Sequence, residues 1–266
     1  HRELTPFPAR RSSDLVNLAA GWDLESIVIT GDTDNGSTVD SITGLATIDV
    51  DPGEDIVVTF TNIKLGTVTI VKDATPDDPQ DFAFTGSLGA FDLDDDADGT
   101  LSNMATFVNL TPGAFVVTES ATAGWDLTNI VISGDTDNGS TVDVATRTVT
   151  IDVDPGEVIT VTFENAKLGT VTIVKDAIPD DPQDFAFPGV LGAFDLDDDA
   201  DGTLSNPTSF TDLLAGVVSV TEGAVAGWDL TGGQFLAQLD RGRSLDPTAP
   251  PVATHLDPGS HILVTF

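Results

Sequence analysis

The stretch Gly66–Asp73 reads Gly-Thr-Val-Thr-Ile-Val-Lys-Asp and recurs almost unchanged at Gly169–Asp176. Val68, Ile70 and Lys72 stand at alternate positions, so their side chains share one face of a β-strand. The two apolar residues predict that this face belongs to the core. A lysine on a core face is costly unless its charge is lost, paired or chemically removed. The fate of this amine therefore decides what the domain does.

A repeat of constant length surrounds this stretch. The tryptophans of a Gly-Trp-Asp-Leu motif, Trp22, Trp125 and Trp228, stand 103 residues apart, and an Asp-Pro-Gly motif keeps the same step. An ungapped period of this length indicates tandem domains rather than a solenoid, whose repeats are shorter. The sequence predicts the C-terminal half of a truncated repeat at residues 16–65, a complete repeat at 66–168, and a nearly complete repeat lacking its last residues at 169–266.

Residues 1–15 match nothing in the repeats. The segment Arg10–Leu15 resembles the translation of a sequencing adapter joined to a metagenomic fragment, and a genuine basic tail is the alternative. We expect this segment to be non-native and to contribute nothing to the fold.

The net charge of −34 argues against nucleic-acid and anionic-membrane partners, because both require a cationic surface. It fits an extracellular surface, a cation binder or a salt-adapted protein. The absence of cysteine excludes disulfides and thiolate metal sites. No apolar run is long enough to span a bilayer.

Within each repeat, short Thr- and Val-rich segments alternate with turn signals, and no segment keeps a helical period. The turn signals of the complete repeat are Pro76–Pro79, Asp98-Gly99, Thr111–Gly113, Asp137–Gly139 and Asp154–Gly156. This pattern predicts an all-β fold of tandem antiparallel β-sandwiches with essentially no helix. The third repeat departs from the pattern over Gly232–Val252, which we expect to be its least regular part.

Three polar residues of the complete repeat, Lys72, Glu119 and Asn165, occupy inward positions of otherwise apolar alternations. The first and last strands of a sandwich can be neighbours, which would place the lysine beside the asparagine. Burial leaves the amine neutral and the carboxyl protonated. Glu119 could then hydrogen-bond the asparagine carbonyl and carry protons as ammonia leaves, giving a Lys–Asn isopeptide bond. The alternative is a lysine that reaches solvent, pairs with Glu119 and leaves Asn165 to cap a turn.

Several motifs together resemble the prealbumin-like repeats of Gram-positive surface proteins, the SpaA-type and Cna B-type domains. These motifs are Val68–Asp73, Asp81–Phe84, Leu93–Asp98, Leu110–Glu119, Gly124–Leu127 and Val161–Asn165. The resemblance implies seven-stranded sandwiches that often close their own isopeptide bond. It assigns Lys72, Glu119 and Asn165 the roles of nucleophile, catalytic acid and amide partner.

The neighbouring repeats hold only part of this set. Lys175 and Glu222 match the lysine and the acid of the third repeat, but the position of its asparagine falls beyond Phe266. Asn62 matches the asparagine in the first half repeat, where the lysine-bearing strand is absent. The sequence therefore predicts one crosslink, in the middle repeat.

Two acidic loops have the Asp-x-Asp-x-Asp-Gly spacing of calcium-binding loops. They are Asp94, Asp96 and Asp98 in the second repeat, and Asp197, Asp199 and Asp201 in the third. The glutamate of an EF-hand is replaced by Ala105, so these are not EF-hands. A solvated hairpin tip is the alternative. Calcium is the only cofactor that the sequence suggests.

The sequence predicts a structural stalk or adhesin spacer of an extracellular or cell-wall bacterial protein. Its partners would be neighbouring repeats and an unidentified host or matrix ligand, with no nucleic acid and no membrane span. It would not be an enzyme beyond single-turnover crosslinking. The alternatives are a calcium-dependent adhesion module and accessory repeats of a larger extracellular enzyme.

Overall fold

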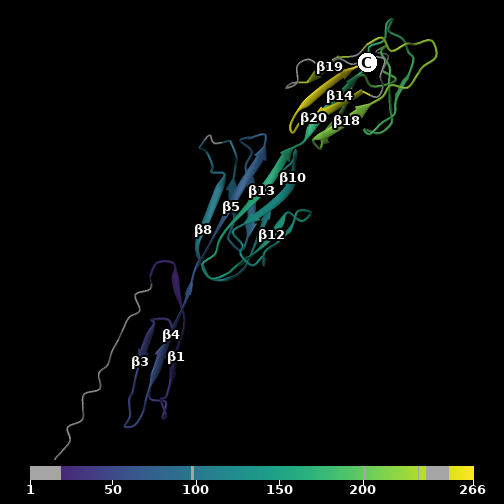
Figure 1. Ribbon diagram of the computed structural model, residues 1–266. Helices are drawn as coiled ribbons and strands as arrows, with labels where there is room; N and C mark the ends of the chain where they lie inside the picture. The colour runs from purple at the N-terminus through teal and green to yellow at the C-terminus, as the bar shows by residue number, and fades with distance from the viewer. Residues whose placement is uncertain (1–18, 97–98, 200–201, 233, 238–251) are drawn as a thin grey trace, which may run out of the picture.

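The computed structural model describes residues 19–96, 99–199, 202–232, 234–237 and 252–266. These residues form β-strands and connecting turns, with no helix among them, as the sequence predicts. Accordingly, no helix in this part of the chain is long and apolar enough to cross a membrane. The strands fall into three groups that follow one another along an elongated molecule (Figure 1).

The middle group is a β-sandwich of two sheets, with strand orders β10-β13-β5-β8 and β11-β12-β9-β6-β7. Its strands are β5 (Gly66–Thr75), β6 (Phe82–Gly86), β7 (Phe91–Leu93), β8 (Met104–Leu110), β9 (Gly113–Glu119), β10 (Trp125–Ser133), β11 (Thr141–Asp143), β12 (Thr148–Val153) and β13 (Val158–Lys167). The sandwich has nine strands where the resemblance implied seven. The sheet edges β7 and β11 are only three residues long.

The first and last strands of this sandwich, β5 and β13, lie side by side, as expected, but they run parallel. Every other strand pair of the two sheets is antiparallel. A parallel pair needs a long crossover connection, and the seven strands between β5 and β13 provide it. The register sets Phe163 opposite Lys72 and Asn165 opposite Ala74.

The core of the sandwich lies between the two sheets. On β5 the side chains of Val68, Ile70 and Lys72 alternate inward, and each is fully buried. The ring of Phe82 meets Trp125 edge-on, with the centroids 5.2 Å apart. Burial of each large apolar side chain contributes about 2 kcal/mol. These contacts hold the lysine within a rigid apolar frame.

The third group repeats much of this arrangement. Its strands are β14 (Gly169–Val174), β15 (Phe185–Phe187), β16 (Phe194–Leu196), β17 (Thr208–Leu213), β18 (Gly216–Val220), β19 (Gln234–Ala237), β20 (Val252–Leu256) and β21 (His261–Thr265). The four-stranded sheet has the order β17-β14-β21-β19, and β14 and β21 are again parallel. Most of Gly232–Val252, expected to be irregular, lies outside the described residues.

The first group contains β1 (Trp22–Thr30), β2 (Thr38–Asp40), β3 (Leu45–Thr47) and β4 (Val57–Lys64). They form two separate pairs, β1 with β4 and β2 with β3. Trp22 is 42% exposed, whereas its equivalent Trp125 is 5% exposed. Trp125 packs on Phe82 of β6, and no strand among the described residues of the first group corresponds to β6.

The junctions between the groups are short. Leu65 alone separates β4 from β5, and Leu168 alone separates β13 from β14. Across the second junction, the backbone N–H of Gly259 donates a 2.8 Å hydrogen bond to the carbonyl of Lys167. At the first junction Gly156 has a φ of 80°, and a side chain there would collide with Lys64. Close packing therefore begins directly at each junction.

Candidate functional site

The sandwich brings Lys72, Glu119 and Asn165 together inside the middle group, from β5, β9 and β13. Their exposed fractions are 0%, 1% and 2%. The inward register that the sequence predicts places all three side chains in the core. Because the lysine is fully buried, the alternative in which it reaches solvent does not describe this structure.

The amine of Lys72 is surrounded by oxygen acceptors. Its Nζ donates hydrogen bonds to Oδ1 of Asn165 at 2.8 Å and to the backbone carbonyls of Phe163 at 3.0 Å and Asp73 at 3.2 Å. The same nitrogen lies 4.3 Å from the centroid of the Phe82 ring. These contacts hold the amine against the amide oxygen of the asparagine.

The carboxyl of Glu119 lies on the other side of the amide. Its Oε2 accepts hydrogen bonds from Nδ2 of Asn165 at 3.3 Å and from Nη1 of Arg147 at 3.1 Å. Its Oε1 has no hydrogen-bond partner, and Nζ of Lys72 lies 3.8 Å from it. The sequence predicted that Glu119 would hydrogen-bond the asparagine carbonyl. It contacts the amide nitrogen instead, where the NH₂ group donates and Oε2 accepts.

Burial alters the pKa values of both ionisable groups. Desolvation lowers the pKa of Lys72 to about 8, although the negative charge of Glu119 opposes this change. Desolvation also raises the pKa of Glu119, opposed chiefly by the positive charge of Lys72. Both shifts favour the uncharged forms, an amine and a carboxylic acid. The site therefore sets a potential nucleophile, an amide and a proton carrier in mutual contact.

The equivalent residues in the neighbouring groups lack parts of this arrangement. Nζ of Lys175 lies 3.1 Å from Oε1 of Glu222, and Lys175 is 6% exposed. No asparagine side chain contacts this amine within the described part of the third group. Asn62 of β4 pairs with Leu24 of β1 and is exposed. Among the described residues, the middle group alone assembles lysine, acid and asparagine.

Arg147 is a member of the site that the sequence reasoning missed. It directly precedes β12 and has a left-handed backbone φ of 57°. Its carbonyl accepts a 3.0 Å hydrogen bond from the N–H of Glu119, while its side chain binds the carboxyl of the same residue. The sequence could have pointed to it, because the equivalent positions of the other repeats hold Gly44 and Pro250, so the arginine occurs only in the repeat that has the complete site.

The predicted calcium loops are only partly within the described residues, since Asp98 and Asp201 lie outside them. Asp94 is 1% exposed; its Oδ2 accepts a 3.1 Å hydrogen bond from Thr100. Its buried Oδ1 has no hydrogen-bond partner. Asp197 accepts the corresponding bond from Thr203, at 2.8 Å. These aspartates are therefore held inside the loop rather than at a solvated tip.

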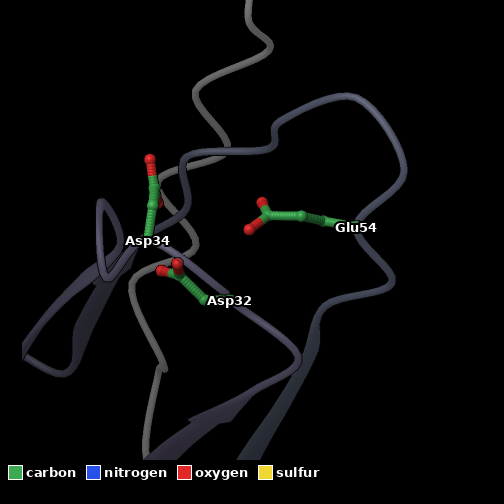
Figure 2. A group of neighbouring side chains, drawn as sticks. All are labelled: Asp32, Asp34 and Glu54. Carbon is green, nitrogen blue, oxygen red and sulfur yellow. The ribbon is translucent and has the colours of Figure 1, made fainter.

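Other acidic residues gather more closely among the described residues. Two sets of three carboxylates have ligand atoms within 4.8 Å of one another, Asp32, Asp34 and Glu54 in the first group, and Asp135, Asp137 and Glu157 in the middle group. Figure 2 shows the Glu54 carboxylate turned toward the loop that carries the two aspartates. The sequence reasoning missed both glutamates.

Hydrogen bonds within the loop account for these sets. Glu157 accepts bonds from the N–H and hydroxyl of Thr136, at 2.8 and 2.6 Å. Hydrogen bonds from Ser140 lower the pKa of Asp135 to about 2. The carboxylates thus hold the loop in place through hydrogen bonds. Nothing else among the described residues of the loop indicates a bound cation.

Residues 68–167 match the family model of the prealbumin-like fold domain, SpaA_4. This match covers the whole of the Lys72, Glu119 and Asn165 site and nearly all of the middle group, which is thus similar to domains of that family. No curated protein matches the chain.

Solved structures were also compared with the chain. The Bacillus anthracis TIE protein is 17% identical with a TM-score of 0.29, over 86% of this chain and 39% of that protein. The chain thus spans well under half of the TIE protein. The major pilin T-13 of Streptococcus pyogenes is 13% identical with a TM-score of 0.26, over 76% of this chain and 97% of that pilin. The shaft pilin SpaA of Lactobacillus rhamnosus GG is 10% identical with a TM-score of 0.24, over 76% of this chain and 98% of that pilin.

Proposed function

We propose, from the premise that residues 68–167 form a prealbumin-like fold domain, that the chain is a stalk segment of an extracellular or cell-wall bacterial protein. In this proposal Lys72 and Asn165 become joined by an isopeptide bond that locks the middle domain. The observation that carries it is the contact between Nζ of Lys72 and Oδ1 of Asn165, 2.8 Å apart in the core.

The reaction begins with a proton transfer that gives the neutral forms of the two ionisable groups, an amine and a carboxylic acid. Lys72 transfers a proton to Oε1 of Glu119, the oxygen that has no hydrogen-bond partner. The free amine then attacks Cγ of Asn165 and becomes the new amide nitrogen. Glu119 delivers a proton to Nδ2, which it already contacts at 3.3 Å, and then takes up the excess proton of the attacking nitrogen, so the acid is regenerated.

The bond from Cγ to Nδ2 breaks, and ammonia leaves. One carbon–nitrogen bond replaces another, so the step needs no oxidant and no co-reactant. It occurs once per domain and is not turned over. It also removes a charge from the core, which offsets the cost of burying a lysine.

The crosslink suits a load-bearing function because of where it joins the sandwich. Lys72 lies on the first strand and Asn165 on the last, and these strands lead to the two junctions. A covalent bond between them would carry tension from one junction to the other without unfolding the domain. The short junctions favour a semi-rigid rod with few free residues between domains.

Intact mass spectrometry of the purified chain tests this proposal. The wild-type chain should weigh less than its sequence by one ammonia, and Lys72→Ala should have its full sequence mass. A wild-type chain with its full sequence mass would refute the crosslink.

A second proposal is that calcium binds the loop of Asp94 and rigidifies the rod. The buried Oδ1 of Asp94 supports it, because a buried carboxylate oxygen without a hydrogen-bond donor is costly and a cation would satisfy it. This proposal is independent of the crosslink.

A further inference from the structure

Arg147 is the charged residue of the site to which the proposed reaction gives no part. Its Nη1 lies 3.1 Å from Oε2 of Glu119, and its side chain is 21% exposed whereas that of Glu119 is fully buried. The backbone N–H of Glu119 donates to the carbonyl of Arg147, so the two residues are joined twice. The arginine therefore covers the carboxyl from the solvent side and fixes its orientation.

The third repeat offers a comparison within the same chain. There Nζ of Lys175 lies 3.1 Å from Glu222, while the distance between Lys72 and Glu119 is 3.8 Å. The position equivalent to Arg147 is Pro250 in the third repeat, so no arginine is encoded there. In the middle repeat, which has the arginine, Oε2 of Glu119 is bound by Arg147. The other oxygen, Oε1, lies 3.8 Å from Nζ of Lys72, which is beyond hydrogen-bond distance.

We propose that Arg147 is a positioning residue for the crosslink, which holds the Glu119 carboxyl at the asparagine amide and keeps it from forming a tight ion pair with Lys72. This inference rests on the proposed isopeptide function and adds the residue that prepares the site for it. A tight ion pair would stabilise the ammonium form of the lysine, which cannot attack. By occupying Oε2, Arg147 leaves Oε1 free to receive the proton of the lysine.

The direction of the pH effect follows from the charges that face the pair. Arg147 and Lys72 face Glu119, while Lys72 also experiences the negative charges of Asp95 and Asp73. Removal of a positive charge makes proton binding more favourable at both groups of the pair. The reactive form has an intermediate number of protons, so its rate profile is bell-shaped. Without Arg147, both limbs of that profile should move to higher pH.

The experiment compares the wild type with Arg147→Gln and Arg147→Lys. Each full chain is synthesised in a short cell-free pulse, transferred to buffers from acidic to alkaline, and sampled by intact mass for loss of ammonia. Arg147→Gln should shift both limbs upward by about one pH unit, which lowers the rate on the acidic limb about tenfold. Arg147→Lys should restore most of the wild-type profile. A purely structural role would instead lower the rate without moving the limbs, and that result would overturn the proposal.

A second measurement keeps the inference separate from the crosslink itself. In the Asn165→Ala background no bond can form, and the carboxyl of Glu119 can be titrated by carbon NMR with labelled glutamate. The pKa of Glu119 should be higher with Arg147→Gln than with Arg147 present, and coincident titrations would overturn the role of Arg147. A wild-type chain that never loses ammonia would instead refute the proposed function.

Discussion

Nζ of Lys72 lies 2.8 Å from Oδ1 of Asn165, between the first and last strands of a sandwich whose core excludes water from both. The two residues are 93 positions apart in the chain, and parallel pairing of β5 with β13 brings them together. A bond between these side chains would therefore close nearly the whole domain into one covalent loop.

Loss of that loop predicts a large loss of stability. Asn165→Ala prevents the crosslink and should lower the free energy of unfolding by about 4.7 kcal/mol, the chain-entropy value for a loop of this length. Urea unfolding of the middle-domain transition measures it. The matched control is Asn62→Ala, which alters the equivalent but exposed asparagine of β4. Equal midpoints for Asn165→Ala and the wild type would contradict the crosslink.

The carboxyl of Glu119 is predicted to be essential for the rate of bond formation. Glu119→Gln keeps the shape of the side chain but cannot carry a proton, so the rate of ammonia loss should fall at least about 100-fold. Glu222→Gln is the matched control, because Lys175 has no asparagine partner within the described residues of its repeat. Intact mass over time distinguishes the two variants. A Glu119→Gln chain that crosslinks as fast as Glu222→Gln would exclude proton transfer by this residue.

We expect Lys72 to make the free energy of unfolding depend on pH when the crosslink is absent. The pKa of Lys72 falls from 10.5 to about 8 on folding because of desolvation. Between these values the unfolded chain holds a proton that the folded chain has lost, so stability rises with pH across that window. Unfolding of Asn165→Ala should show this rise, and Lys72→Met in the same background should lack it. If the free energy of unfolding of the two variants rose equally with pH, the rise would not come from Lys72.

Much of this site could be predicted from the sequence because strand periodicity determines which side chains face inward. Lys72, Glu119 and Asn165 each continue an apolar alternation, and in the structure all three are buried in contact. The neighbouring first and last strands were also expected. Their parallel direction was not anticipated, since local patterns specify a strand but not the orientation of a partner some ninety residues away.

Other features depend on contacts that a sequence pattern does not encode. Arg147 reaches Glu119 from a turn, with a left-handed backbone conformation, and so belongs to no strand alternation. Glu157 joins Asp135 only after two separate turns meet. Trp22 and Trp125 have the same motif but opposite exposure, because only the second has Phe82 to pack against.

The acidic loops yield a prediction of their own. If calcium satisfies the buried oxygen of Asp94, calorimetric titration of the full chain at physiological salt should show binding that Asp94→Asn weakens at least about tenfold. Asp135→Asn is the control, because hydrogen bonds from Ser140 already satisfy that loop. Equal binding by the wild type and Asp94→Asn, or no binding at all, would exclude calcium at this loop.

Peptide mapping tests the central claim most directly. Trypsin cannot cleave after an acylated lysine, so a crosslinked Lys72 would leave residues 65–147 as one peptide, joined through Asn165 to residues 148–167. The account predicts this branched peptide, lighter by one ammonia than its two parts, with fragment ions that locate the bond at Lys72 and Asn165. Separate peptides 65–72, 73–147 and 148–167 at their full masses would contradict it.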